Sequence, residues 1–185
     1  MTLIQQSEIS DIWLRSAHRQ ASPNHDPRPD NNVDLLVIHN ISLPPGQFQG
    51  NHIEDFFCNR LDPGLHPYFE TIADMRVSAH LLIRRDGRVI QFVPLNRRAW
   101  HAGVSSFRGR ESCNDYSIGI ELEGTDDLPY TEPQYRKLAE VTELIRRHYP
   151  AITKQRITGH CNIAPKRKTD PGPAFDWADY LGRLK

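Results

Sequence analysis

The alternation of apolar and polar residues along the chain predicts two central β-strands. Leu35–Ile38 is an uninterrupted apolar run, which is typical of a strand covered on both faces at the centre of an α/β sheet. Residues 116–124 alternate instead, so a strand here would place apolar side chains on one face and the carboxylates of Glu121 and Glu123 on the other. Carboxylates on an interior strand are costly to bury unless one of them is functional or paired. This strand therefore already suggests a site.

A β-hairpin is the clearest local signal. Residues 80–93 contain two β-rich runs joined by Asp86-Gly87, and a tight turn needs the positive φ that Gly87 adopts without strain. By contrast, residues 21–32 are rich in proline, asparagine and aspartate. Such a composition predicts an irregular surface lead-in without regular structure.

Two helices are predicted. Residues 131–150 place apolar side chains along one helical stripe, and Thr131 with Gln134 forms a capping-box pattern at the start. Residues 51–61 have apolar side chains at helix-like spacing and predict a shorter helix that includes Cys58.

The chain length limits how these elements are organised. The 185 residues suffice for one well-buried core and are too few for two ordinary domains. We therefore expect a single domain over residues 1–185 of the α/β (α+β) class, with a central mixed β-sheet flanked by helices. The irregular lead-in at 21–32 would precede most of it.

Composition excludes several classes of partner. The 23 basic and 23 acidic residues cancel, which removes the positive field that a nucleic-acid-binding protein uses. No stretch approaches the roughly 20 apolar residues that span a bilayer, and residues 1–20 lack the pattern of a secretory signal. We expect a soluble protein that binds neither nucleic acid nor membrane.

The cysteines indicate a compartment. Cys58, Cys113 and Cys161 are odd in number and scattered, so they cannot form a complete disulfide framework, and a reducing compartment is the simpler interpretation. We expect a cytoplasmic protein, and a monomer.

The segment "TGHCNIAPKRKTDPG", residues 158–172, collects several metal-binding and proton-transferring groups. The proline between His160 and Asp170 favours a loop, which could turn both residues inward together. A catalytic zinc takes three protein ligands and keeps a fourth position open, and His39 at the end of a central strand is the preferred third ligand. Spacing alone is a weak signal here, because a lone histidine at a strand end is more often a hydrogen-bonded structural residue.

The basic residues of the same segment divide into two groups. Lys168 and Asp170 are two apart, so extended backbone would point both to one side and place an ammonium beside the metal, where it would suit an oxyanion. Lys166 and Arg167 fit a solvated surface cluster.

One carboxylate of the alternating strand is a candidate general base. Zinc lowers the pKa of bound water to about 7, and Glu121 or Glu123 could then accept a proton and pass it to a leaving amine. Strand alternation does not decide between the two, because both lie on one face. The set of groups indicates amide hydrolysis.

Other candidates have ordinary structural interpretations. His66, His80 and His101 fit structural or pocket-wall residues better than ligands, and Cys161 should be a buried thiol that points away from His160. Trp100 offers a flat apolar surface to a sugar ring, although simple packing explains it equally well.

Five motifs together resemble one known family. They are "VIHNISLPPG", "VSAHLLIRRDG", "RAWHAGVSSFRGR", "CNDYSIGIELEGTD" and "TGHCNIAPKRKTDPGPAFDW", and they extend through nearly all of the chain from about residue 10. The chain resembles the zinc-dependent amidase_2 family, and within it the cytoplasmic 1,6-anhydro-N-acetylmuramoyl-L-alanine amidases. The resemblance implies a fold like that of peptidoglycan recognition proteins and hydrolysis of the amide between anhydromuramic acid and L-alanine in cell-wall recycling.

The resemblance also implies roles for individual residues. It implies zinc on the three ligands proposed above, Glu121 rather than Glu123 as general base, and Lys168 at the oxyanion. Asn40 and Arg76 resemble positions that line the substrate groove, where an amide could hold the sugar and a guanidinium could bind a peptide carboxylate.

Two departures favour the anhydro branch of the family. Asp170 stands where phage lysozyme-type amidases and peptidoglycan recognition proteins usually have cysteine, and Ala79 stands where those relatives often have a tyrosine near the zinc. The main rival hypothesis is a muropeptide-binding module without catalysis. A binder would not need the carboxylate and lysine that hydrolysis requires. A general zinc exopeptidase is disfavoured, because the chain has no HExxH motif.

Overall fold

The centre of the molecule is a six-stranded mixed sheet with strand order β1-β5-β4-β9-β3-β10. The computed structural model describes residues 11–185. The strands of this sheet are β1 (His18–Arg19), β3 (Leu35–Ile41), β4 (Leu81–Ile83), β5 (Val89–Gln91), β9 (Ser117–Glu123) and β10 (Ile157–Gly159). Neighbouring strands are parallel except β4 and β5, which form the predicted hairpin. The predicted central strands and the mixed sheet are confirmed.

Helices complete the fold. They are α1 (His52–Phe57), α2 (Pro67–Ile72), α3 (Glu132–His148), α4 (His160–Ile163) and α5 (Trp177–Gly182), with short 3-10 turns η1 (Pro63–Leu65), η2 (Cys113–Asp115) and η3 (Lys154–Arg156). Thr131 and Gln134 form the predicted capping box of α3. Cys58 is not within α1 as predicted but caps its C-terminus, because the helix ends at Phe57. Within residues 11–185, no helix has the length and apolar character needed to cross a membrane.

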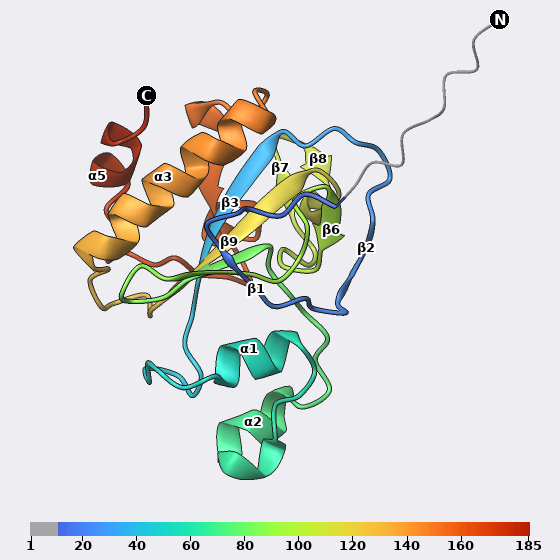
Figure 1. Cartoon of the computed structure of the whole chain (residues 1–185), viewed down its shortest axis with the longest axis vertical. Helices are drawn as coiled ribbons and strands as arrows, with labels where there is room; N and C mark the ends of the chain where they lie inside the picture. Colours follow the sequence, from blue (N-terminus) through green and yellow to red (C-terminus); the bar gives the residue numbers. More distant parts are fainter. Residues whose placement is uncertain (1–10) are drawn as a thin grey trace, which may run out of the picture.

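One face of the sheet is covered by α3 and α5, which lie together beside β3 and β9 (Figure 1). Alternate side chains of the two central strands, such as Ile38 and Ile120, pack in one cluster with Leu138 and Ile145 of α3 and Tyr180 of α5. Each such aliphatic side chain contributes about 1.5–3 kcal/mol when fully buried. This apolar layer fixes which side chains of β9 point the other way.

The opposite face supports a lobe that contains α1 and α2, seen below the sheet in Figure 1. Its apolar side chains, Phe56 and Phe57 of α1 and Phe69 of α2, pack in one cluster with Leu82 of β4. Leu35 and Val37 of β3 pack on this side in a separate cluster with Tyr116 and Ile163. The long central strands are buried on both faces, as the run Leu35–Ile38 predicts.

A buried ion triad attaches this lobe to the sheet. Arg84, at the hairpin, donates to Glu123 Oε1 of β9 at 2.6 Å and to Glu54 of α1 at 2.5 Å. Its three side chains are all at least 92 % buried. The hairpin turn that carries Arg84 uses Gly87 with φ of +86°, as predicted. Glu123 is thus a paired carboxylate with a structural role.

The prediction of an irregular surface lead-in at residues 21–32 is wrong in part. β2 (His25–Pro27) pairs antiparallel with β6 (Arg97–Ala99), and Arg28 is buried, with its guanidinium donating to the carbonyl of Ser117. Prolines did not prevent pairing, because this two-stranded ribbon is short and separate from the main sheet. A second ribbon joins β7 (Ser106–Phe107) and β8 (Arg110–Glu111).

Candidate metal centre and active site

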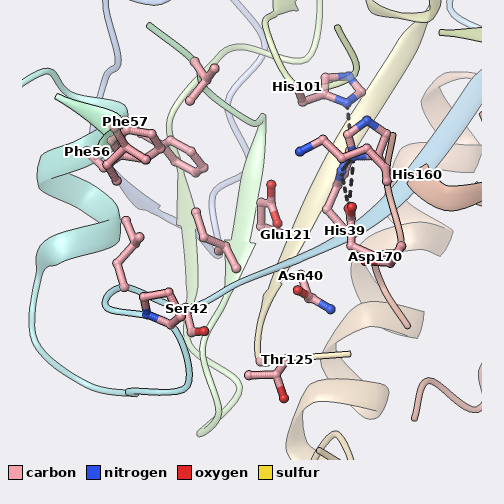
Figure 2. Close-up of a pocket in the computed structure, with 18 of the residues that line it drawn as sticks. His39, Asn40, Ser42, Phe56, Phe57, His101, Glu121, Thr125, His160 and Asp170 are labelled. Carbon is pink, nitrogen blue, oxygen red and sulfur yellow. Dashed lines mark hydrogen bonds and ion pairs between the residues drawn. The ribbon is translucent and has the colours of Figure 1, made fainter. Parts of the chain in front are cut away.

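Three side chains from separate parts of the chain converge at one edge of the sheet. His39 lies near the end of β3, His160 begins α4, and Asp170 lies in the loop after it. His39 Nδ1 is 3.0 Å from both His160 Nδ1 and Asp170 Oδ2, and His160 Nδ1 is 3.1 Å from Asp170 Oδ2. Figure 2 shows the two imidazoles and the carboxylate pointing toward one another. The predicted ligand set is therefore brought together.

The outward nitrogens of both imidazoles have partners of their own. His160 Nε2 lies 3.1 Å from the carbonyl oxygen of Ala102, which accepts its proton. His39 Nε2 lies 2.9 Å from His101 Nδ1. The proton on His160 Nε2 leaves Nδ1 of that ring as a lone pair directed at the Asp170 carboxylate.

This donor set fits a divalent cation. Two imidazole nitrogens and one carboxylate oxygen lie within about 3 Å of one another, and three protein donors of these kinds are what a catalytic zinc takes from a protein. Burial lowers the pKa of His39 to about 4, which keeps the ring neutral. Burial raises the pKa of Asp170, but the close polar contacts with His160 and His39 outweigh it and hold the pKa below its ordinary value. Neutral imidazole and ionised carboxylate are the forms that bind metals.

A network of polar groups fixes the loop that carries Asp170. Asn40 Nδ2 donates to the carbonyl of Pro171 at 3.1 Å and to Asp126 Oδ1 at 2.8 Å, and the Tyr130 hydroxyl donates to the same carbonyl at 2.8 Å. Gly172 has φ of +79°, and a Cβ atom there would lie 2.2 Å from the backbone of Asp126. Asn40, predicted from the resemblance to contact substrate, lines the cavity but also holds this loop.

Glu121 stands beside the three candidate ligands. It lies opposite His39 in the register of β9 and β3, so both side chains leave the same face of the sheet. Glu121 Oε2 is buried and has no hydrogen-bond partner within residues 11–185. Burial, with the nearby charge of Asp170, raises the pKa of Glu121 well above its ordinary value. Glu123 forms the ion pair described above, so the structure separates two carboxylates that the sequence pattern left equivalent.

The basic segment before Asp170 differs from its predicted conformation. Lys168 is half-buried and lines the cavity, but its backbone N–H donates to Ala164 in a turn, so the backbone is not extended as assumed. Arg167 is not simply solvated as predicted, because it donates to the carbonyls of Ala102 and Val104 at 2.6 and 2.9 Å. Arg167 therefore helps to fix the loop whose Ala102 carbonyl accepts the outward proton of His160.

The cavity in front of the cluster has a volume of about 640 Å³ and two unlike walls. Figure 2 shows Phe56 and Phe57 across the cavity from the histidines, with Glu121 between them. Trp100 lines the cavity, as a sugar-stacking role requires. Arg76 is exposed and does not line it, and its guanidinium donates to the carbonyls of two neighbouring residues.

The remaining candidates have structural roles. His66 caps α2, and His80 is fully buried with Nδ1 accepting from Gly119 N–H at 3.0 Å. Cys161 is half-buried rather than buried as predicted, and it follows His160 in a helix rather than in extended backbone. The partnership of His101 with His39 was missed by sequence reasoning, because no spacing rule links residues 62 positions apart.

The chain is similar to known amidases over most of its length. The family model described as N-acetylmuramoyl-L-alanine amidase matches residues 29–173. The chain is 62% identical over 173 residues to the 1,6-anhydro-N-acetylmuramyl-L-alanine amidase AmpD of Citrobacter freundii, covering 93% of this chain and 92% of that protein. The Escherichia coli (strain K12) protein of the same name is 60% identical over 169 residues, covering 91% and 92%.

Solved structures extend the likeness to the fold. The crystal structure of a selenomethionine derivative of AmpD superposes with a TM-score of 0.92 at 59% identity, covering 95% of this chain and 98% of that one. An Escherichia coli amidase, AmiD, solved with anhydro-N-acetylmuramic acid-L-Ala-D-gamma-Glu-L-Lys, has a TM-score of 0.60 at 28% identity, covering 92% and 60%. Both the motifs and the fold lead to one conclusion: the chain belongs to the N-acetylmuramoyl-L-alanine amidase family.

Proposed function

We propose that this amidase uses zinc to hydrolyse the amide between 1,6-anhydro-N-acetylmuramic acid and the L-alanine of muropeptides, in peptidoglycan recycling. The observation that carries the proposal is the unpartnered, buried carboxylate of Glu121 beside three converging metal donors. The names of the relatives at about 60% identity support the same substrate.

The proposed metal ligands are His39, His160 and Asp170. A bound zinc supplies a Lewis acid that polarises a carbonyl and lowers the pKa of water to about 7. Asp170 contributes one negative charge and the two imidazoles contribute none, so the site keeps a net positive charge with zinc bound. A positive site favours the negative charge that develops on a carbonyl oxygen during attack on an amide.

Glu121 is the proposed general base. Its carboxylate takes the proton from the attacking water and then gives it to the leaving nitrogen of L-alanine. An unpartnered oxygen suits this exchange, because no hydrogen bond within the protein must be broken first. Lys168, which lines the cavity without an ion-pair partner in residues 11–185, would place its ammonium near the developing oxyanion.

Substrate contacts are proposed for three further residues. Trp100 would offer its ring to a sugar. Asn40 would contact the substrate with the hydrogen-bonding groups of its amide that the loop contacts leave free. Arg76 lies between two residues that line the cavity, so it could meet a stem-peptide carboxylate at the rim after leaving its present carbonyl partners.

The proposal includes a cytoplasmic monomer with one amidase domain. All three cysteines, which lie within the described part of the chain, are free thiols, and this supports a reducing compartment. Cell fractionation and analytical ultracentrifugation test the location and the oligomeric state.

The decisive experiment compares two substrates. Zinc-loaded protein is incubated with anhydromuropeptide and, separately, with intact cell-wall sacculi, and released stem peptide is measured by mass spectrometry. Release from the soluble anhydromuropeptide alone supports a recycling enzyme. Tight binding of the muropeptide without release would instead establish a recognition module.

A further inference from the structure

A chain of hydrogen bonds runs from the ligand His39 away from the metal centre. His39 Nε2 lies 2.9 Å from His101 Nδ1, and His101 Nε2 lies 3.1 Å from the hydroxyl of Ser117. The Ser117 hydroxyl in turn donates to the carbonyl of Cys113. Neither Ser117 nor Cys113 is among the three metal donors.

The last acceptor fixes every proton in this chain. A carbonyl only accepts, so the Ser117 hydroxyl must donate to Cys113 and can only accept from His101. His101 then carries its proton on Nε2 and presents a lone pair at Nδ1. That lone pair accepts the Nε2 proton of His39, which leaves Nδ1 of His39 as the lone pair facing the centre.

The loop that carries His101 orients the second imidazole as well. Asn114 Oδ1 accepts from the backbone N–H groups of His101 and Ala102 at 3.1 and 2.8 Å, which fixes both residues. The carbonyl of Ala102 then accepts the outward proton of His160. Two consecutive residues thus receive the outward protons of both histidine ligands.

Gly119 provides the space that the His101 ring occupies. A Cβ atom at this position would lie 2.5 Å from the ring, closer than two such atoms can approach. The strand that carries Glu121 therefore has a glycine at a position where any side chain would displace His101.

We infer that His101 and Ser117 are positioning residues that hold His39 in the tautomer with its proton on Nε2, so that Nδ1 is available to the metal. The inference rests on the metal site of the proposed function. It assigns a role in metal binding to Ser117, which contacts no proposed ligand directly.

Ser117→Ala gives the sharpest test. Without the hydroxyl, His101 is free to move its proton to Nδ1, where it would face the proton of His39 and disfavour the metal-binding tautomer. We expect the zinc dissociation constant, measured by competition with a chromogenic chelator, to rise about 10- to 100-fold. Ser22→Ala is the matched control, because Ser22 is also a buried serine that donates to a backbone carbonyl, outside this chain of bonds. Its zinc affinity should stay within about threefold of the unmodified protein.

Variants at His101 separate proton acceptance from packing. His101→Asn places an amide oxygen near the position of Nδ1 and can still accept from His39, whereas His101→Ala cannot. We expect the asparagine variant to bind zinc at least tenfold more tightly than the alanine variant. Equal zinc affinity in these two variants would assign His101 a packing role and overturn the inference.

Nitrogen-15 NMR of the metal-free, full-length protein gives a readout independent of zinc and of activity. His39 and His101 should both carry their protons on Nε2 in the unmodified protein, and Ser117→Ala should add a population with the proton on Nδ1. An unchanged tautomer together with unchanged zinc affinity in Ser117→Ala overturns the inference. If the unmodified protein binds zinc with these tautomers but releases no stem peptide, the proposed function fails while the inference stands.

Discussion

His39 on β3 and Glu121 on β9 are direct neighbours across two parallel strands. Because neighbouring residues in register point to the same face, the first proposed metal ligand and the candidate base are placed by the sheet rather than by a loop. Rigid elements position reacting groups more accurately than loops do. The proposed geometry of water activation therefore depends on strand pairing.

Glu121→Gln should separate activity from stability. The amide cannot accept a proton, so we expect kcat to fall at least about 100-fold while zinc content stays unchanged. The same change removes a buried carboxylate with an unpartnered oxygen, so the melting temperature should rise. Steady-state kinetics, zinc analysis and calorimetry test these outcomes.

Glu123→Gln is the control on the same strand face. It should reduce stability by weakening the pair with Arg84, and leave kcat within a few-fold of the original. Undiminished turnover in zinc-loaded Glu121→Gln would contradict the general-base role.

Asp170→Ala should weaken metal retention. Removal of the one anionic donor leaves two neutral imidazoles, so zinc should be lost on dialysis against a chelator that does not strip the unmodified protein. Asp127→Ala is the control, because it removes an exposed aspartate that is not one of the three donors, and it should retain zinc. Equal zinc content in both variants after dialysis argues against Asp170 as a ligand.

Lys168→Met should lower kcat more than it alters KM. The ammonium is proposed to act on charge that develops during the reaction, and the loss of one such group costs about 100-fold or more. Lys166→Met removes an exposed lysine of the same segment and should leave both constants nearly unchanged. A rise in KM with constant kcat would instead show that Lys168 binds substrate only.

Unfolding of the metal-free protein should depend on pH through His80. Burial, with the charge of Arg28, holds the pKa of His80 well below its ordinary value of about 6.5. The unfolded chain binds a proton at His80 that the folded protein does not bind. The contribution of neutral His80 to the free energy of unfolding is therefore fully present above about pH 6.5. It is lost as the pH falls, by up to about 1.4 kcal/mol per pH unit.

A variant isolates this effect. His80→Asn keeps an acceptor for the Gly119 N–H but cannot titrate, so the difference between the two proteins in urea unfolding should shrink as the pH is lowered from 7 to 5.5. If the free energies of unfolding of the two proteins change in parallel over this pH range, His80 is not the cause of the pH dependence.

Arg84→Met should destabilise the protein by about 3–5 kcal/mol, because it leaves the buried carboxylates of Glu54 and Glu123 without their counter-ion. Urea unfolding measures this loss. Arg88→Met is the control, since Arg88 pairs with Asp86 at the exposed surface and such pairs contribute at most about 1 kcal/mol. Similar losses in the two variants would contradict a structural role for the triad.

Much of the fold could be predicted from local patterns. The run Leu35–Ile38, the Asp86-Gly87 turn and the capping box of Thr131 each depend on neighbours in sequence, and each is confirmed. Strand β2 was missed because its partner lies about 70 residues away and supplies the backbone groups that stabilise it. Proline content reports on local preference only.

The candidate site divides in the same way. The histidines and Asp170 were found from their chemistry and from the family motifs, and the structure brings them together. The pairing of Glu123 with Arg84 and the contact of His101 with His39 could not be found, because both arise from the packing of distant segments. Backbone assumptions also failed at Lys168, where a turn rather than an extended strand directs the side chain.

The two walls of the cavity come from different stretches of sequence. Every proposed reacting group lies on β3, β9 or the segment after β10, whereas much of the apolar wall lies between Leu43 and Val77. Arg84 joins the two parts without contributing to either wall. Grafting a different segment between Leu43 and Val77 is therefore a direct route to amidases with altered glycan or peptide preference and an unaltered hydrolytic apparatus.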